Sequence, residues 1–331
     1  MMKKKAAGGQ GVAGVAGRDG SIASRRGAGR TMSIAHEFEY ERAATLAEAL
    51  GWLAKPGTMA LAGGTDLIAW LRDGAVTPKR VVDVKGIPEL QGIAKERGGR
   101  WLRVGAAVPL AEVVESELVR EVAPELAEAA SMMASVGVRN RGTVAGNICS
   151  AVPCCDCGPA LLVLGAEVVV AGKGGERRVG IDDWFLGPRK TALKLGELVT
   201  GIRIPIRAHW GAFAKLKRYR GEDLAQASAA VSVSEKGEWR VALGSVGPVP
   251  MRSPAAEKAL SGKDAGKLSA ADFEQAGEAA AQEARPITDI RSSETYRRLM
   301  TAVLVKRAAA QAVARRAGKG VELGVNVMEE D

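Results

Sequence analysis

The stretch Gly137–Ala160, with the sequence GVRNRGTVAGNICSAVPCCDCGPA, decides how the rest of the chain is interpreted. Its first part, Gly142–Asn147, is a run of small residues that can bring backbone N–H groups close to a ligand. Its second part holds all four cysteines of the protein, Cys149, Cys154, Cys155 and Cys157. Taken alone, such a stretch predicts a structural loop with tight turns, so its meaning depends on the loops elsewhere in the chain.

Composition and charge argue against a membrane protein and against nucleic-acid binding. The chain has 331 residues, 47% of them hydrophobic, and no apolar run long enough to cross a bilayer. The net charge is +9, but residues 1–31 carry seven basic residues against one acidic residue, which leaves only +3 for the remainder. An aromatic content of 4% is too sparse for a surface on which bases stack.

The first 31 residues are rich in Gly, Ala and Arg and are predicted to be a disordered basic tail. They lack the apolar segment of a secretory signal. Two interpretations stay open: a translation start at Met32 rather than Met1, or a basic anchoring tail. The cysteines cluster within nine residues instead of spreading as a disulfide framework would, which favours a reducing cytoplasm.

The first patterned segment predicts a small β-turn-α-β unit. Thr45 is placed to cap a helix, and Glu48 occupies the position that a capping box requires. The unit consists of a helix over residues 46–54, a strand over 58–62, a helix over 67–73 and a strand over 80–84. The middle of the chain is predicted to contain hairpins over 91–96 with 100–108 and 166–171 with 176–179, helices over 109–117, 119–135 and 158–164, and a strand over 198–204.

The last third of the chain changes character. Alternating patterns predict three antiparallel strands over residues 211–220, 225–233 and 239–246. Helices follow over 254–260, 270–283 and 293–317, and the last has Leu299, Val303, Leu304, Val305 and Ala308 on its apolar side.

A second glycine loop indicates a function for the stretch Gly137–Ala160. Leu61–Leu67 lies between a strand and a helix, and Gly63 and Gly64 allow close approach of a phosphate. It matches neither a Rossmann fingerprint nor a P-loop, and Asp66 is also interpretable as a capping residue. Two such loops about eighty residues apart suit a dinucleotide whose pyrophosphate is held from both sides, unlike the Rossmann arrangement.

The third element is Lys215–Asp223, with the sequence KLKRYRGED. Strand alternation places Lys215, Lys217 and Tyr219 on one face. One interpretation is a solvated strand face with an ion pair at its turn. The other is a cation beside an electron-accepting ring, where positive charge stabilises the reduced anionic form.

Four motifs in this order resemble the FAD-binding medium subunit of the molybdenum hydroxylases, the family of xanthine dehydrogenase, carbon monoxide dehydrogenase and hydroxybenzoyl-CoA reductase. They are Ala62–Asp66, Gly142–Asn147 with Asp156, Gly187–Thr191 with 197–205, and Lys215–Ala225. The similarity covers residues 33–316.

The resemblance implies an α+β chain with the two-subdomain FAD-binding fold of the p-cresol methylhydroxylase and vanillyl-alcohol oxidase type, followed by a C-terminal three-stranded antiparallel sheet with helices. The expected boundaries are 32–88 and 89–206 for the two FAD-binding subdomains, 207–317 for the C-terminal domain and 318–331 for a tail.

The resemblance also implies FAD-binding positions. The pyrophosphate would lie against Ala62, Gly63, Gly64, Thr65 and Asp66 on one side and Thr143, Ala145, Gly146 and Asn147 on the other. Asp156 would hold the ribityl or ribose hydroxyls, Val199 would pack on the isoalloxazine, and Lys215 and Asp223 would lie near the flavin edge. Met133 departs from the family, since it falls where relatives place an aromatic ring.

The cysteines are the larger departure. Relatives carry small polar residues where this chain has Cys154-Cys155-Asp156-Cys157. Thiolates at these positions are chemically suited to an iron–sulfur cluster, but the spacing matches no standard pattern. We expect small, partly buried thiols and no metal site.

The sequence therefore predicts an electron-transfer subunit of a cytoplasmic heterotrimer. A molybdopterin-binding large subunit would oxidise substrate, a [2Fe–2S] small subunit would pass on electrons, and FAD here would deliver them to NAD⁺ or another acceptor. The substrate would be set by the large partner. The alternatives are a stand-alone flavin oxidase or dehydrogenase of the same fold, with a covalent flavin link to Cys149 conceivable, and a non-catalytic scaffold that binds a nucleotide and docks partners.

Overall fold

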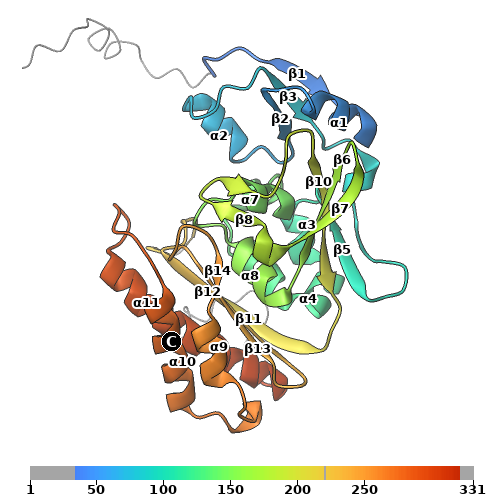
Figure 1. Cartoon of the computed structure of the whole chain (residues 1–331). Coiled ribbons are helices and arrows are strands. Elements are labelled where there is room, and N and C mark those ends of the chain that lie inside the picture. The colour runs from blue at the N-terminus through green and yellow to red at the C-terminus, as the bar shows by residue number, and fades with distance from the viewer. Residues whose placement is uncertain (1–33, 220, 321–331) are drawn as a thin grey trace, which may run out of the picture.

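The computed structural model describes residues 34–320 except residue 220 (Figure 1). The predicted tail over 1–31 lies outside the described residues, as does all but the start of the predicted tail over 318–331. Three sheets with their helices follow one another along the chain.

The first sheet is small and entirely parallel, with the strand order β1-β3-β2. The predicted helix begins after Thr45, whose Oγ1 accepts a hydrogen bond from the Glu48 N–H at 3.2 Å. The Glu48 carboxylate returns to the N–H of Ala44 at 2.8 Å, one residue earlier than in a standard capping box. The first strand was not predicted because its polar sequence shows no apolar alternation. The elements are β1 (Glu39–Arg42), α1 (Leu46–Leu53), β2 (Thr58–Leu61), α2 (Leu67–Arg72) and β3 (Arg80–Asp83).

The second sheet is antiparallel, with the strand order β4-β5-β10-β6-β7. Its central strand is buried along nearly all of its length and ends at Pro205, as predicted, although it contains the polar residues Thr200 and Arg203. A register shift between Val199 and Gly201 interrupts its pairing with β6. The strands are β4 (Ile93–Lys95), β5 (Trp101–Gly105), β6 (Glu167–Gly172), β7 (Gly175–Gly180) and β10 (Leu198–Pro205), with a separate hairpin of β8 (Phe185–Gly187) and β9 (Lys190–Thr191).

The helices of this part correct one prediction. The expected single helix over 119–135 is divided at Ala123, because Pro124 has no N–H to continue the helical ladder and starts a new helix instead. Pro109 likewise precedes its helix as the capping residue rather than lying in the first turn. The helices are α3 (Leu110–Glu115), α4 (Glu117–Val122), α5 (Pro124–Ser131), α6 (Val136–Arg139), α7 (Val144–Ser150) and α8 (Cys157–Leu164), with short 3₁₀ turns at η2 (Pro88–Leu90) and η3 (Ile181–Asp183).

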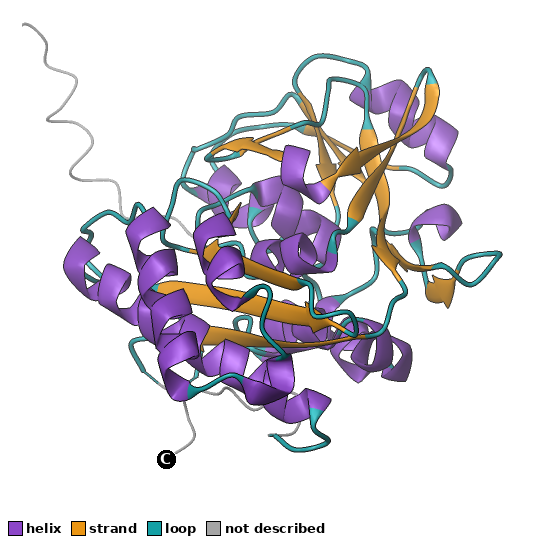
Figure 2. Cartoon of the chain, turned by 60° about the horizontal axis from the view of Figure 1, so that its bottom comes forward, coloured by secondary structure: helices purple, strands orange, loops and turns teal. Residues whose placement is uncertain are grey.

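The C-terminal domain contains the three predicted antiparallel strands and a fourth, two-residue edge strand. Its sheet lies between α9, α10 and α11 on one face and the FAD-domain helices α5 and α8 on the other (Figure 2). Ser269 and Asp272 form a capping box at the start of α10. The elements are β11 (His209–Leu216), β12 (Ala227–Ser234), β13 (Trp239–Gly244), β14 (Met251–Arg252), α9 (Pro254–Leu260), η4 (Ala265–Lys267), α10 (Ala270–Glu283) and α11 (Glu294–Arg316).

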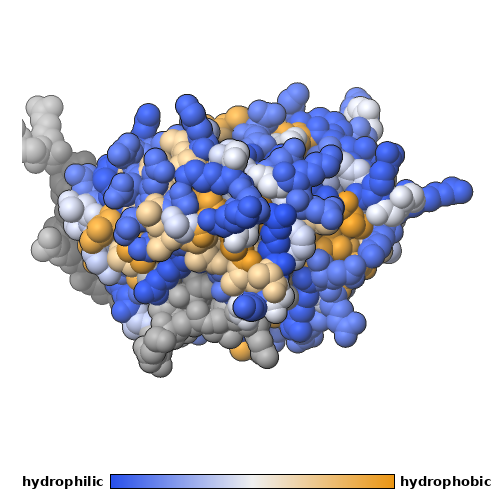
Figure 3. Space-filling model, turned by 90° about the horizontal axis from the view of Figure 1, so that it is seen from below, coloured by the Kyte–Doolittle hydropathy of each residue, from blue (hydrophilic) through white to orange (hydrophobic). Residues whose placement is uncertain are grey.

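Two details of this domain differ from the sequence prediction. The first strand ends at Leu216, so Lys217 and Tyr219 lie in the following turn and do not share a strand face with Lys215. On α11, Leu304, Val305 and Ala308 are fully buried as predicted, whereas Leu299 is exposed. Seen from below, the surface is largely hydrophilic, with small hydrophobic patches scattered across it (Figure 3).

Candidate functional site

One cavity of about 700 Å³ gathers the predicted site residues. Its size lies within the roughly 300–1,000 Å³ typical of small-molecule and cofactor sites. The first sheet, the α7–α8 region and the start of the C-terminal domain all contribute to its walls. All thirteen residues predicted to bind the cofactor line it: Ala62, Gly63, Gly64, Thr65, Asp66, Thr143, Ala145, Gly146, Asn147, Asp156, Val199, Lys215 and Asp223.

The first glycine loop packs directly on the second. A Cβ built on Gly63 would lie 1.9 Å from the carbonyl oxygen of Arg141, so only glycine allows the two backbones to come this close. Gly64 has a φ of +78°, the left-handed conformation that glycine adopts without strain. The loop then enters α2, whose first-turn N–H groups have no partners within the helix.

Asp66 does not cap α2, which overturns one interpretation of the sequence. Its carboxylate instead accepts a hydrogen bond from the Ser150 hydroxyl at 2.5 Å. Because Ser150 is the last residue of α7, this bond ties the first loop to the helix that follows the second loop.

The second loop is shorter than predicted, because α7 already begins at Val144. Thr143 is its capping residue, and the Thr143 Oγ1 accepts a hydrogen bond from the Gly146 N–H at 2.8 Å. Ala145, Gly146 and Asn147 therefore face the cavity from the first turn of a helix rather than from a turn. Two helix starts, α2 and α7, thus meet at one side of the cavity.

Asp156 and Lys215 form a buried ion pair on the cavity wall, with 2.6 Å between Nζ and Oδ2. Lys215 also donates to the carbonyl oxygen of Met132 at 3.2 Å. Burial raises the pKa of the Asp156 carboxyl, and the charge of Lys215 opposes that rise. The second carboxylate oxygen, Oδ1, is buried and has no hydrogen-bond partner. A buried, unpaired acceptor at a cavity wall is costly unless a ligand hydroxyl or water reaches it.

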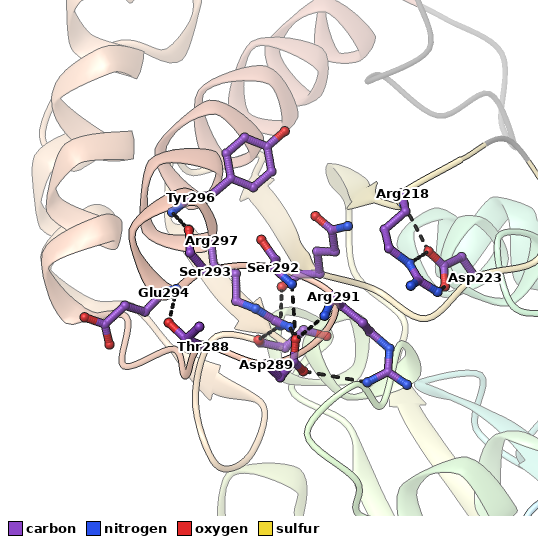
Figure 4. Close-up of polar contacts among 12 residues, drawn as sticks. Arg218, Asp223, Thr288, Asp289, Arg291, Ser292, Ser293, Glu294, Tyr296 and Arg297 are labelled. Atoms are coloured by element: carbon purple, nitrogen blue, oxygen red, sulfur yellow. Dashed lines mark hydrogen bonds and ion pairs between the residues drawn. The ribbon is translucent and has the colours of Figure 1, made fainter.

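Asp223 lies at the end of the turn after β11, next to the cavity. Its carboxylate accepts hydrogen bonds from the backbone N–H and the guanidinium of Arg218, all at 3.0 Å (Figure 4). These bonds, led by the guanidinium, hold the pKa of Asp223 at about 2. The carboxylate is thus charged at neutral pH and closes the turn, so the predicted ion pair is present.

The four cysteines are free thiols, and Cys155 and Cys157 are buried. Cys155 Sγ donates to the Asn147 side-chain oxygen at 3.0 Å, and the Cys157 N–H donates to the same oxygen at 3.1 Å. The amide nitrogen of Asn147 is then left pointing toward Met133 Sδ, at 3.8 Å, on the cavity wall. Within residues 34–320, no three His, Cys, Asp or Glu side chains are grouped to hold a metal ion.

Cys149 is the residue to which a covalent flavin link was considered, and it lines the cavity. Burial raises the pKa of its thiol to about 12. At neutral pH the group is therefore the protonated thiol and not the nucleophilic thiolate. Its environment does not favour covalent attachment.

Sequence reasoning assigned no role to one part of the cavity wall. The segment Leu193–Leu198 lines it, fixed by Arg177, whose guanidinium makes two 2.7 Å bonds to the Glu197 carboxylate. Trp70 also lines it, with the Arg189 guanidinium 4.2 Å from its ring centre. Glu197 and Leu198 belong to the motif over 197–205, but they had no predicted role, and Gly196 before them has a φ of +79°.

The fold and the cavity define a flavoprotein with an FAD-binding domain. The family described as "FAD binding domain in molybdopterin dehydrogenase" matches residues 36–207, and the "CO dehydrogenase flavoprotein C-terminal domain" matches residues 211–312. The chain belongs to the FAD-binding medium-subunit family of the molybdenum hydroxylases. It is accordingly an FAD-binding subunit of an oxidoreductase.

Individual relatives agree with this assignment. The chain is 34% identical to the carbon monoxide dehydrogenase medium chain of Hydrogenophaga pseudoflava, over 85% of this chain and 99% of the relative. It is 30% identical to the xanthine dehydrogenase FAD-binding subunit of Escherichia coli O157:H7, over 85% and 97%. A solved structure of the Hydrogenophaga pseudoflava carbon monoxide dehydrogenase superposes with a TM-score of 0.79 over 84% of this chain and 98% of that chain. None of the helices that the structure describes is long and apolar enough to cross a membrane.

Proposed function

We propose that this chain is the middle member of a cytoplasmic electron-transfer complex. A molybdopterin-binding large subunit would oxidise the substrate, and a small subunit with [2Fe–2S] clusters would carry the electrons onward. FAD held by this chain would receive them and reduce NAD⁺ or another acceptor. The free cysteines support a reducing compartment.

The observation that carries the FAD site is the pairing of two helix starts with an unsatisfied acceptor in one cavity. At the starts of α2 and α7, the N–H groups of Ile68 and Gly146 already donate to the Gly64 carbonyl oxygen and to Thr143 Oγ1. The other first-turn N–H groups are suited to the negative oxygens of a pyrophosphate. The buried Oδ1 of Asp156, which has no protein partner, is suited to a hydroxyl of the ribityl or ribose chain. The residues present therefore fit FAD, which supplies the ability to exchange electrons singly or in pairs.

The residues of this chain would bind FAD, fix its orientation and polarise it. Lys215 would hold Asp156 in place through their ion pair, and Val199 would present an apolar surface to the ring system. Asp223 holds the turn at the cavity edge through Arg218. These assignments of single residues are our proposal and rest on their common position in the cavity.

The experiment is a titration of the purified chain with FAD, monitored by the quenching of flavin fluorescence. We expect one FAD per chain and at least tenfold weaker binding by Asp156→Ala. Protein that cannot be loaded with FAD would contradict the proposal at its first step. With FAD bound, NADH-dependent reduction of a dye tests the acceptor. Its absence would exclude NAD⁺ while leaving the FAD site standing.

A further inference from the structure

A row of buried polar contacts joins helix α5 of the FAD-binding domain to strand β11 of the C-terminal domain. Alternate residues of β11, from His209 to Lys215, lie on one face of the strand. Glu125 and Glu128 of α5 and Met132 at its C-cap meet that face, and their spacing of three and four residues places them on one side of the helix. We call these contacts the α5–β11 ladder.

The ladder ends at the cavity. In each of its three contacts a nitrogen of β11 lies against an oxygen of α5 or its C-cap. The contacts are His209 Nε2 with Glu125 Oε2 at 3.3 Å, the Phe213 N–H with Glu128 Oε2 at 2.9 Å, and Lys215 Nζ with the Met132 carbonyl oxygen at 3.2 Å. His209 and Lys215 are six residues apart, which is about 20 Å along a strand. The ladder therefore connects His209 to the cavity residue that pairs with Asp156.

The helix and the strand are too close to shift independently. A Cβ built on Gly211 would lie 1.7 Å from Glu125 Oε1, so only glycine lets this carboxylate lie against the strand. Arg315 of α11 pairs with Glu128 and donates to the Gly211 carbonyl oxygen at 2.6 Å. Both glutamates are fully buried. A change at one end of the ladder is therefore carried by closely packed groups rather than absorbed by solvent.

The geometry of His209 requires a proton on both ring nitrogens. Nε2 lies 3.2 Å and 3.3 Å from the two carboxylate oxygens of Glu125, and Nδ1 lies 3.0 Å from the carbonyl oxygen of Arg207. A carboxylate and a carbonyl oxygen only accept hydrogen bonds, and the ring donates from both nitrogens only as the imidazolium. A neutral His209 loses one of these two bonds.

The groups around His209 allow it to titrate. Burial lowers the pKa of His209, but the carboxylate of Glu125 raises it by more, so the net pKa is raised. The ring lines a small cavity of about 10 Å³, which is close to the room that one water needs, so a proton can reach it. The charged groups of the surrounding elements are Glu125 and Glu128 of α5, Arg315 of α11, Arg207 before β11, Glu238 before β13 and Arg240 on β13.

We propose that the α5–β11 ladder makes the binding of FAD sensitive to the protonation of His209. The imidazolium holds β11 in register on α5, and this register places Lys215 beside Asp156 at the cavity. Loss of the proton breaks one contact at the far end of the ladder, and the Lys215–Asp156 pair is then held less firmly. The inference rests on the proposed FAD site at Asp156.

The first experiment measures the Kd for FAD by fluorescence titration between pH 6 and pH 9. We expect the wild type to bind FAD about fivefold more weakly at pH 9 than at pH 6, at the lower end of usual allosteric couplings. His209→Gln keeps an uncharged donor near Glu125 at every pH, and its Kd should change by less than about twofold. His36→Gln is the matched control, because His36 is the other histidine of the chain and contacts the Pro78 carbonyl oxygen instead. It should keep the wild-type pH dependence.

The second experiment does not depend on the folding of a His209 variant. Nitrogen NMR of the imidazole rings follows both histidines of the wild-type chain, and the His36→Gln spectrum identifies His209. We expect both ring nitrogens of His209 to carry protons at pH 6. Because coupling between two sites is reciprocal, bound FAD should raise the pKa of His209.

The outcomes separate this inference from the FAD site itself. A wild-type chain that binds FAD equally at pH 6 and pH 9 would overturn the inference and leave the FAD site standing. The inference also fails if His209→Gln keeps the wild-type pH dependence, if His36→Gln loses it, or if FAD leaves the pKa of His209 unchanged. A wild-type chain that binds no FAD at either pH would contradict the proposed function.

Discussion

The contact between the two glycine loops makes the substitution Gly63→Ala decisive. The added Cβ would lie 1.9 Å from the Arg141 carbonyl oxygen and 2.8 Å from the Gly142 Cα. Cβ contacts under 3.0 Å essentially do not occur, so the loops must separate by about 1.1 Å. Both neighbouring groups are backbone atoms, and no side-chain rotation relieves the clash.

The magnitude follows from this geometry. Overpacking of a tight contact costs about 1–3 kcal/mol, and a clash with backbone belongs at the upper end. We therefore expect the free energy of unfolding to fall by about 3 kcal/mol. A separation of this size also breaks at least one charge-assisted hydrogen bond to a bound pyrophosphate. That loss, at about 1.5–3 kcal/mol, weakens FAD binding about 10- to 100-fold.

Chemical denaturation of the FAD-free chain and FAD titration by fluorescence measure the two effects separately. The matched control is Gly51→Ala in α1, where nothing lies within 4 Å of the added Cβ. Because this glycine is inside a helix, its replacement should stabilise the chain by about 0.5–1 kcal/mol and leave FAD binding unchanged. A Gly63→Ala chain with wild-type stability and affinity would refute the loop-on-loop arrangement.

Three further experiments test the surrounding structure. Lys215→Met should lower the free energy of unfolding by about 3–5 kcal/mol, because it leaves the Asp156 carboxylate buried without a counter-charge. Adding Asp156→Asn should restore the stability measured in denaturant titrations but not the affinity for FAD. Cys155→Ala should weaken FAD binding severalfold in the fluorescence titration, because it releases the Asn147 amide. Cys155→Ser keeps a hydrogen-bond donor and should bind FAD as the wild type does. Equal losses of affinity in both variants would disprove the role of Cys155 in orienting Asn147. Burial lowers the pKa of His209, but the buried carboxylate of Glu125 raises it by more, so the net pKa is raised. The ion pair with Glu125 therefore stabilises the folded chain below about pH 6.5, and this stabilisation is lost as the pH rises through the folded-state pKa. We expect denaturation midpoints measured from pH 6 to 9 to decline less in His209→Asn than in the wild type.

Local chemistry accounts for what the sequence predicted well. The helices of the C-terminal domain were placed almost to the residue, because Ser269 and Ser293 cap them and an apolar stripe marks the buried face of the last. The thirteen predicted cofactor positions were carried over from the family resemblance; they line one cavity, and their binding of the cofactor stays a prediction. Pro124 is also a local signal, since proline starts a new helix here, but the sequence prediction ran one helix through it.

The remaining errors concern contacts between distant parts of the chain. The ion pair of Lys215 with Asp156, 59 residues away in the chain, was not predicted. Asp66 was interpreted as a cap, although Ser150 holds it from 84 residues away. Nothing in the local pattern encodes such pairs, since they depend on how the sheets assemble. For the same reason no role was predicted for residues 193–198, although 197 and 198 belong to the motif over 197–205.

The cysteine cluster shows how a prominent sequence signal can have a modest structural role. Burial raises the pKa of all four thiols, so at neutral pH they are neutral groups suited to packing and to donating hydrogen bonds. Cys155 and the backbone of Cys157 together occupy the Asn147 oxygen, which directs the amide nitrogen toward the cavity. The second half of the stretch Gly137–Ala160 thus fixes the orientation of a residue in its first half. Cys155 and Cys157 thus orient one polar side chain of the loop that faces the cavity.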